Sequence, residues 1–134
     1  MNKIEHIGIA VKSLKDSNKL FESLFGKTHY KIESVKSESV NTSFFKLGES
    51  KIELLEATDD EGPIAKFIAK KGEGIHHIAF DVDDIEKEIK RLKKEGFIVL
   101  NEKPKKGADN KWVAFLHPKS TNGVLIELCQ EIAK

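Results

Sequence analysis

The chain has 134 residues, of which 34% are charged and 39% hydrophobic, and its formal net charge is +1. This length suits one compact domain with a real core. The near cancellation of charge removes the general attraction to nucleic acid that a basic protein has. No apolar run approaches the roughly 18 residues that a membrane helix needs. We therefore expect one globular domain with no nucleic-acid partner and no membrane partner.

The first half shows the pattern of a strand, a helix and then three further strands. A strand is expected over about 4–11. Ser13, with Asp16 three residues later, resembles a capping box, and apolar residues follow at helical spacing until Gly26 ends the helix. Strand-like runs come next, the last of them around Glu53. The order is β-α-β-β-β, which indicates an α+β fold.

A short helical connector follows, and then the plan of the first half is repeated. Pro63 is placed to open the connector helix, and Gly72 and Gly74 come after it. In the second half, Asp83 and Glu86 are expected to cap the helix as Ser13 and Asp16 do in the first. Strands are expected near Phe97–Leu100, Trp112–Leu116 and Val124–Cys129, with a Lys- and Gly-rich loop from Glu102 to Lys111.

These elements predict one domain over residues 1–134 that contains two modules. The first module covers about 1–57, the connector about 58–73 and the second module about 74–134. The single cysteine, Cys129, cannot form an internal disulfide, and the start of the chain leads into a strand rather than an apolar signal segment. We therefore expect a reducing, cytoplasmic environment.

The most informative pattern is a motif pair that occurs twice. The run His6-Ile-Gly-Ile-Ala-Val is echoed by His77-Ile-Ala-Phe-Asp-Val, and Lys51-Ile-Glu-Leu-Leu is echoed by Leu125-Ile-Glu-Leu-Cys. Each half therefore contributes one histidine and one glutamate at nearly equal separations. Duplicated units fold alike, and a twofold relation between them would bring equivalent positions together.

Four potential metal ligands follow from this repeat: His6, Glu53, His77 and Glu127. Alternation along a strand places each glutamate on the face opposite its apolar neighbours, so both carboxylates are expected on one face of a sheet. A charged group buried there needs a partner. Imidazole nitrogens and carboxylate oxygens suit divalent ions such as Co²⁺, Mn²⁺, Ni²⁺ or Zn²⁺, and a metal site is the hypothesis that we draw from the residues.

The same residues resemble a known family. Paired modules with two histidines and two acidic ligands are similar to the vicinal oxygen chelate (glyoxalase/bleomycin resistance/dioxygenase) superfamily. Within it the likeness is to the methylmalonyl-CoA epimerase family, and it rests on four motifs: Pro63-Ile-Ala-Lys-Phe, Gly74-Ile-His-His-Ile-Ala-Phe, Leu116-His-Pro-Lys-Ser and Asn122-Gly-Val-Leu-Ile-Glu-Leu.

The resemblance implies a fold, a cofactor and a reaction. The fold would be two tandem β-α-β-β-β modules forming a curved mixed sheet around a metal site, with His6, Glu53, His77 and Glu127 as ligands. The reaction would be epimerisation of (R)- and (S)-methylmalonyl-CoA by proton abstraction at C2 through a metal-stabilised enolate. Relatives are commonly homodimers, and the implied partner is a small-molecule acyl-CoA.

Epimerisation needs a proton-transferring group on each side of the enolate plane. Glu53 and Glu127 are the candidate catalytic residues. Some epimerases are proposed to use a separate glutamate from the first module. The local candidate for that residue is Glu38, while position 42 is occupied by Thr42, so the second base is left open.

Three alternative functions use the same scaffold. A glyoxalase I-type lactoylglutathione lyase would isomerise a glutathione hemithioacetal at the same kind of metal site. A non-catalytic, ligand-sequestering protein of the bleomycin-resistance kind would bind no divalent ion, and the His/Glu quartet argues against it. An Fe(II) dioxygenase is disfavoured by the fourth ligand, Glu53, because such sites use two histidines and one carboxylate.

Overall fold

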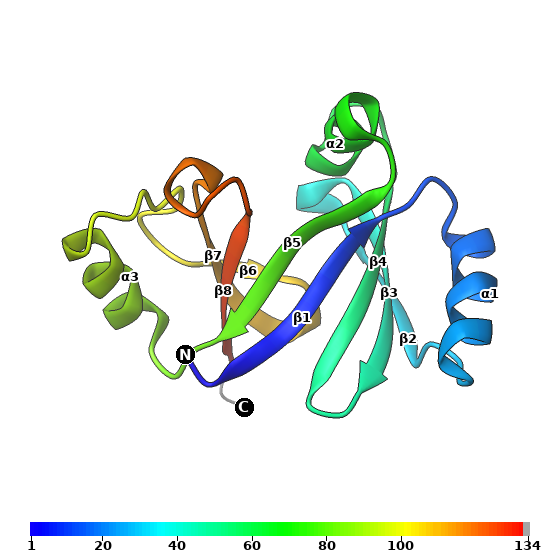
Figure 1. Ribbon diagram of the computed structural model, residues 1–134, viewed down its shortest axis with the longest axis horizontal. Coiled ribbons are helices and arrows are strands. Elements are labelled where there is room, and N and C mark those ends of the chain that lie inside the picture. The colour runs from blue at the N-terminus through cyan, green and yellow to red at the C-terminus, as the bar shows by residue number, and fades with distance from the viewer. Residues whose placement is uncertain (133–134) are drawn as a thin grey trace. The chain divides into compact units, whose positions relative to one another are not determined.

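The computed structural model describes residues 1–132. This described part contains three α-helices and eight β-strands (Figure 1). In chain order they are β1 (Lys3–Ala10), α1 (Leu14–Phe25), β2 (Lys31–Val35), β3 (Val40–Leu47), β4 (Ser50–Ala57), α2 (Pro63–Lys71), β5 (Gly74–Asp81), α3 (Ile85–Lys94), β6 (Lys105–Gly107), β7 (Lys111–Leu116) and β8 (Ile126–Glu131).

The chain divides into two compact units. The first-half unit is His6–His76, and the second-half unit comprises residues 1–5 together with those from His77 onward. Each unit contains a strand, a helix and three further strands in chain order. The predicted α+β fold of two β-α-β-β-β modules with mixed strand directions is therefore confirmed. The predicted domain and module boundaries stay a prediction.

The first-half unit has the strand order β2-β3-β4-β1. β1 runs parallel to β4, and the other two pairs are antiparallel. Helix α1 begins after Ser13, whose hydroxyl accepts a hydrogen bond from the Asp16 N–H at 3.1 Å. It ends at Gly26, whose φ of 70° is a conformation that glycine adopts without strain. Both predicted helix signals are confirmed.

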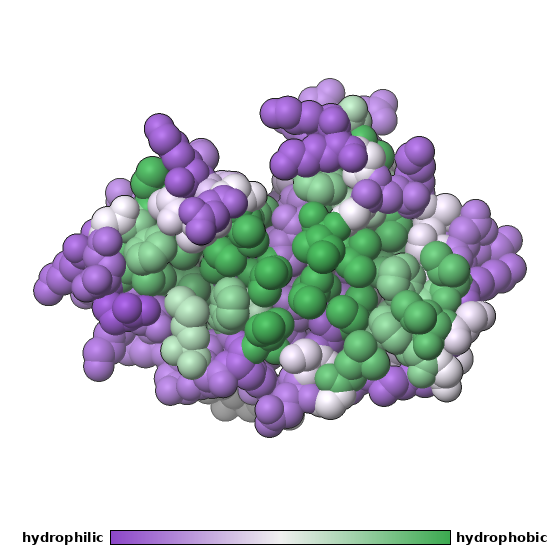
Figure 2. All heavy atoms as spheres, in the orientation of Figure 1, coloured by the Kyte–Doolittle hydropathy of each residue, from purple (hydrophilic) through white to green (hydrophobic). Residues whose placement is uncertain are grey.

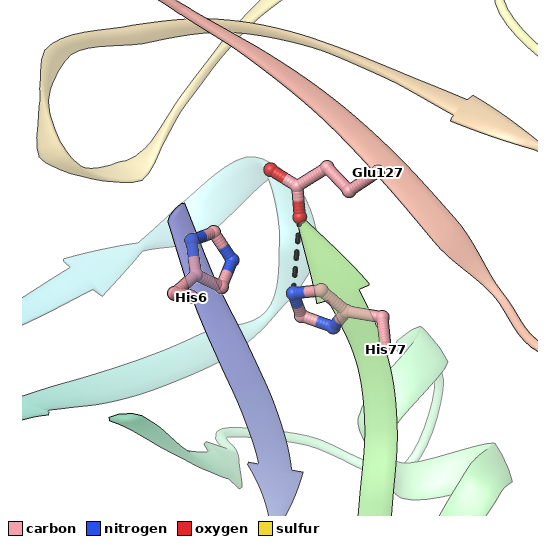
Figure 3. Close-up of side chains that lie close together, drawn as sticks. All are labelled: His6, His77 and Glu127. Carbon is pink, nitrogen blue, oxygen red and sulfur yellow. Dashed lines mark ion pairs between the residues drawn. The ribbon is translucent and has the colours of Figure 1, made fainter. Parts of the chain in front are cut away.

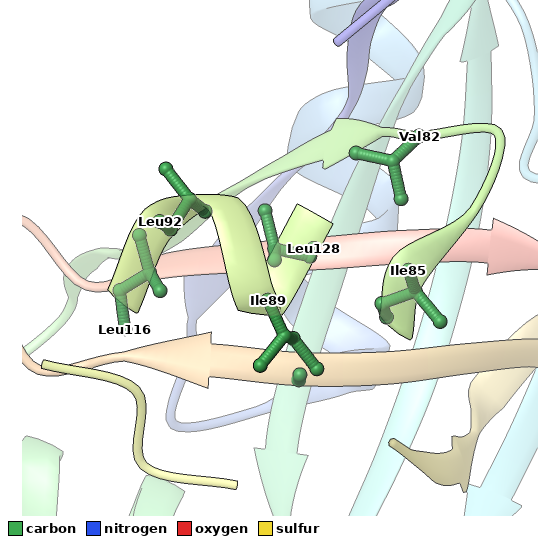
Figure 4. Packing of buried hydrophobic residues seen from close by; sticks show 7 residues of the cluster. Val82, Ile85, Ile89, Leu92, Leu116 and Leu128 are labelled. Atoms are coloured by element: carbon green, nitrogen blue, oxygen red, sulfur yellow. The ribbon is translucent and has the colours of Figure 1, made fainter. Parts of the chain in front are cut away.

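The second-half unit repeats this arrangement with the order β5-β8-β7-β6. β5 runs parallel to β8, and the remaining pairs are antiparallel. Helix α3 packs on β7 and β8 through a buried apolar cluster (Figure 4): Val82, Ile85, Ile89, Leu92, Ala114, Leu116 and Leu128. In each unit apolar side chains gather between the helix and its strands, and the outer surface of α3 is hydrophilic (Figure 2).

The predicted cap of the second helix is wrong by one residue. Asp84 caps α3, because its side chain accepts a hydrogen bond from the Lys87 N–H at 3.1 Å. Asp83 instead accepts from the Asn2 amide at 2.9 Å. Aspartate is a strong N-cap residue, and two adjacent aspartates gave two possible starts for the helix. The helix begins where its apolar stripe, from Ile85, faces the strands.

The predicted strand at Phe97–Leu100 is also wrong. This segment contributes one isolated bridge, between Val99 and Leu116. Its apolar character reflects packing, because Phe97 and Val99 lie against the cluster beneath α3. The strand in this position of the module is β6, which lies inside the predicted Lys- and Gly-rich loop and pairs with β7. A strand of three residues at a sheet edge carries almost no hydrophobic periodicity.

The connector contains the predicted helix, α2. Pro63 is its first residue. At its end the N–H of Gly72 donates a hydrogen bond to the Ile68 carbonyl at 2.8 Å. Among the residues that the structure describes, no helix combines the length and the apolar composition that crossing a bilayer requires.

Replacing Asp84 with Ala should lower the free energy of unfolding by about 1 kcal/mol, since an N-cap hydrogen bond is lost. The matched control is Asp83→Ala, for which we expect less than about 0.5 kcal/mol because its contact with Asn2 is exposed. Urea denaturation followed by circular dichroism measures both. A larger loss for Asp83→Ala would contradict the assigned cap.

Candidate metal centre

His6 and Glu53 meet on one face of the first-half unit. In the parallel register of β1 and β4, Gly8 is the partner of Glu53 and His6 is the partner of Lys51, so His6 and Glu53 point to the same side. The His6 Nδ1 lies 3.1 Å from the Glu53 Oε2. Both side chains are only 6% exposed.

His77 and Glu127 form the equivalent pair in the second-half unit. The strands β5 and β8 are parallel, with Ala79 as the partner of Glu127. The His77 Nε2 lies 3.0 Å from the Glu127 Oε1 (Figure 3). The other carboxylate oxygen accepts a hydrogen bond from the Cys129 thiol at 3.0 Å. The ring of Phe115 packs edge to face against His77 and helps to hold the imidazole.

The two pairs have the chemistry of metal ligands. All four residues are buried, with relative exposures of 4–6%. A buried carboxylate is costly without a hydrogen bond or an opposite charge, and each one here faces an imidazole nitrogen. Nitrogen and carboxylate oxygen donors together suit divalent ions of the Co²⁺, Mn²⁺, Ni²⁺ and Zn²⁺ group. The residues of each pair, one nitrogen donor and one carboxylate oxygen donor, therefore fit the ligands of a metal centre.

The other three histidines have local partners. His29 pairs with Glu22, with 2.8 Å between the Nδ1 and the carboxylate. His76 packs edge to face against Phe67. The Nδ1 of His117 accepts a hydrogen bond from the backbone N–H of Lys119 at 2.9 Å, so His117 fixes the turn that follows β7.

Glu38, the sequence candidate for a second base, ends a 3₁₀ turn. The next residue, Ser39, has a φ of 53°, and its carbonyl accepts from the Thr58 N–H at 3.0 Å. Hydrogen bonds from the Ser39 side chain and from the Glu61 N–H lower the pKa of the Asp59 carboxyl. The backbone beside Glu38 is therefore tied to the loop that precedes α2.

Sequence reasoning missed one acidic residue on the face of the first-half unit that holds Glu53. In the antiparallel ladder of β2 and β3, Glu33 lies directly opposite Thr42, which is 1% exposed. Residues directly opposite each other in a ladder share a face. Recognising Glu33 requires the pairing register of β2 and β3. That register depends on the 3₁₀ turn at Lys36–Glu38, which the sequence does not reveal.

Known proteins are similar to this chain in sequence and in fold. Residues 5–115 match the family described as the Glyoxalase/Bleomycin resistance protein/Dioxygenase superfamily. The mitochondrial methylmalonyl-CoA epimerase of Dictyostelium discoideum is 41% identical over 96% of this chain and 78% of its own. The ethylmalonyl-CoA/methylmalonyl-CoA epimerase of Cereibacter sphaeroides is 38% identical over 97% of this chain and 98% of its own.

A solved structure of a methylmalonyl-CoA epimerase is also similar to this chain. A Streptomyces coelicolor methylmalonyl-CoA epimerase variant in complex with 2-nitronate-propionyl-CoA has a TM-score of 0.95 and 32% identity, covering 99% of this chain and 96% of its own. The chain therefore belongs to the glyoxalase/bleomycin resistance/dioxygenase superfamily and, within it, to the methylmalonyl-CoA epimerase family. The family resemblance predicted from the sequence is confirmed.

The thiol of Cys129 should influence metal binding through Glu127, because groups that orient a ligand typically change metal affinity by 10- to 100-fold. We expect Cys129→Ala to weaken Co²⁺ binding about tenfold. Cys129→Ser, which keeps a donor, should stay closer to the parent protein. Titration with Co²⁺ followed by visible absorption gives the affinities. Equal affinities in all three proteins would contradict this role of the thiol.

Proposed function

We propose that this protein is a metal-dependent epimerase that interconverts (R)- and (S)-methylmalonyl-CoA. The observation that carries the proposal is a buried His–Glu pair at the equivalent position of each unit, in a chain of the methylmalonyl-CoA epimerase family. The substrate class, a small acyl-CoA, is supported by the acyl-CoA analogue bound to the Streptomyces coelicolor relative.

We further propose that His6, Glu53, His77 and Glu127 bind one divalent ion together. Each pair alone supplies only two ligands. His6 lies in β1 and Glu53 in β4, and His77 and Glu127 lie in the equivalent strands β5 and β8. Equivalent ligand positions in the two halves are expected for a shared site in a duplicated fold.

His6, Glu53, His77 and Glu127 would hold the ion and leave it open to a bidentate substrate. A bound divalent ion would withdraw electron density from the thioester carbonyl and so ease loss of the C2 proton. The carboxylates of Glu53 and Glu127 are the proposed proton-transferring groups that we carry forward from the sequence. In the reaction one base removes the C2 proton, the C–H electrons move toward the thioester carbonyl, and a proton returns to C2 from the opposite face.

Three further properties belong to the proposal. The ion is one of Co²⁺, Mn²⁺, Ni²⁺ or Zn²⁺. The chain acts as a single domain in a homodimer, which is supported by large exposed apolar side chains such as Leu20 and Leu24 on α1, at 65% and 68% exposure. The protein works in the reducing cytoplasm, which agrees with a single, buried cysteine, Cys129.

Proton exchange at C2 of methylmalonyl-CoA in D₂O tests this function. We expect metal-stripped protein to be inactive, and protein reloaded with Co²⁺ to incorporate deuterium while chirality is lost. Metal uptake without deuterium exchange would contradict the proposed epimerase function. Hemithioacetals would then be the substrates to test, as for a glyoxalase I-type enzyme. Absence of metal uptake would favour a ligand-sequestering protein instead.

Removal of one ligand should abolish metal retention as well as turnover. We expect His77→Ala and Glu127→Ala to lose the ion, because each leaves a buried partner without its counterpart and a ligand set of three. The control is His29→Ala, whose partner is Glu22 and which should keep both properties. Metal analysis after gel filtration and an epimerisation assay report the two effects. Full activity in His77→Ala would refute the assigned ligands.

A further inference from the structure

In the epimerase proposed above, Glu53 would both bind the ion and transfer a proton. The first-half unit offers another carboxylate for the second task, outside the His/Glu quartet. The inference below rests on that proposed function. Its starting point is the face of the sheet that carries His6 and Glu53, because a group that reaches a substrate held there must lie on the same face.

The strand registers identify which residues share this face. In the ladder of β3 and β4, Phe44 lies opposite Glu53. In the ladder of β2 and β3, Lys31 lies opposite Phe44 and Glu33 lies opposite Thr42. The Lys31 ammonium sits 4.7 Å from the centre of the Phe44 ring, which confirms that the two side chains are on one side. Glu33, two residues after Lys31, points to that side as well.

Among the described residues of β2, β3 and β4, two carboxylates occupy this face, and they are Glu53 and Glu33. Glu56 points to the other side, where it accepts a hydrogen bond from the Leu14 N–H. The residue between Glu33 and β4 is Thr42, which is small and buried. A glutamate on β2 can extend over a threonine, whereas a larger residue in this position would obstruct it.

We propose that Glu33, in place of Glu53, is the second proton-transferring residue of the epimerase. Strand spacing and rise place its Cα about 12 Å from that of Glu53, two strands across and two residues along. Each glutamate side chain spans several Å, so the two carboxylates leave room for a small acyl group between them.

The environment of Glu33 suits this task. Its side chain is 36% exposed, so a substrate can reach the carboxylate, and the Lys31 ammonium lies 3.6 Å away as a counter-charge. The backbone that carries Glu38, the other acidic candidate, is tied to the loop before α2 through Ser39. A residue on a strand is held more firmly for repeated proton transfer than one in a 3₁₀ turn.

The proton transfer can be written in full. The Glu33 carboxylate removes the C2 proton of one epimer, the C–H electron pair moves into the C2–C1 bond, and the thioester carbonyl gains the negative charge. The protonated carboxyl group of the opposite base, assigned to Glu127 above, then returns a proton to the other face of C2. The other epimer follows the same path in reverse, and no oxidant or reductant is needed.

The test compares Glu33→Gln with Glu38→Gln in metal-loaded protein, in D₂O, starting from each pure epimer. Glutamine keeps the shape but cannot accept the proton. We expect Glu33→Gln to slow epimerisation by about 10²- to 10⁴-fold. It should still exchange the C2 proton of the epimer that faces the remaining base, with retention of configuration. Glu38→Gln should epimerise like the parent protein, and Glu33→Asp should recover part of the rate.

Exchange of only one epimer is a readout that a purely structural effect of the substitution would not produce. Normal epimerisation by Glu33→Gln, or equal loss of exchange for both epimers with metal content retained, would overturn the assignment of Glu33. Loss of epimerisation in Glu38→Gln alone would assign the role to Glu38 instead. Failure of the unaltered, metal-loaded protein to exchange either epimer would refute the proposed function itself, which separates the two failures.

Discussion

The burial of two carboxylates, each beside an imidazole, is the constraint on which the rest of the structure depends. Glu53 and Glu127 could not remain charged in the interior without a partner. In each unit the first and last strands of the module run parallel and adjacent, β1 with β4 and β5 with β8. This pairing brings a histidine near the start of the module against a glutamate near its end. In each unit a helix covers the opposite face of the sheet. Ile52 and Leu54 pack beneath α1, and Leu128 packs beneath α3.

The sequence predicted those parts of the molecule that depend on local chemistry or on repetition. The repeated His and Glu motifs identified both buried pairs, and Ser13 and Gly26 marked the two ends of α1. Pro63 marked the start of α2 for the same reason, since its fixed φ and missing N–H suit the first helical turn. Each of these signals depends on a few neighbouring residues, so it can be recognised without knowledge of the fold.

Features that depend on strand register could not be predicted in this way. Asp83 and Asp84 are equivalent as cap residues, and the choice between them was made by the packing of α3 on β7 and β8. The strand β6 was hidden in a polar loop because its partner is β7 and its side chains are largely exposed. Glu33 escaped notice because a slip of one residue in the β2–β3 hairpin would place it on the opposite face.

The stoichiometry of Co²⁺ binding tests the central claim, a single ion held by both pairs, most directly. A single shared ion predicts one Co²⁺ per chain, with binding abolished equally by Glu53→Gln in the first-half unit and by Glu127→Gln in the second. Two ions per chain, or the loss of only half of the bound metal in each variant, would show two separate sites and contradict a shared ion.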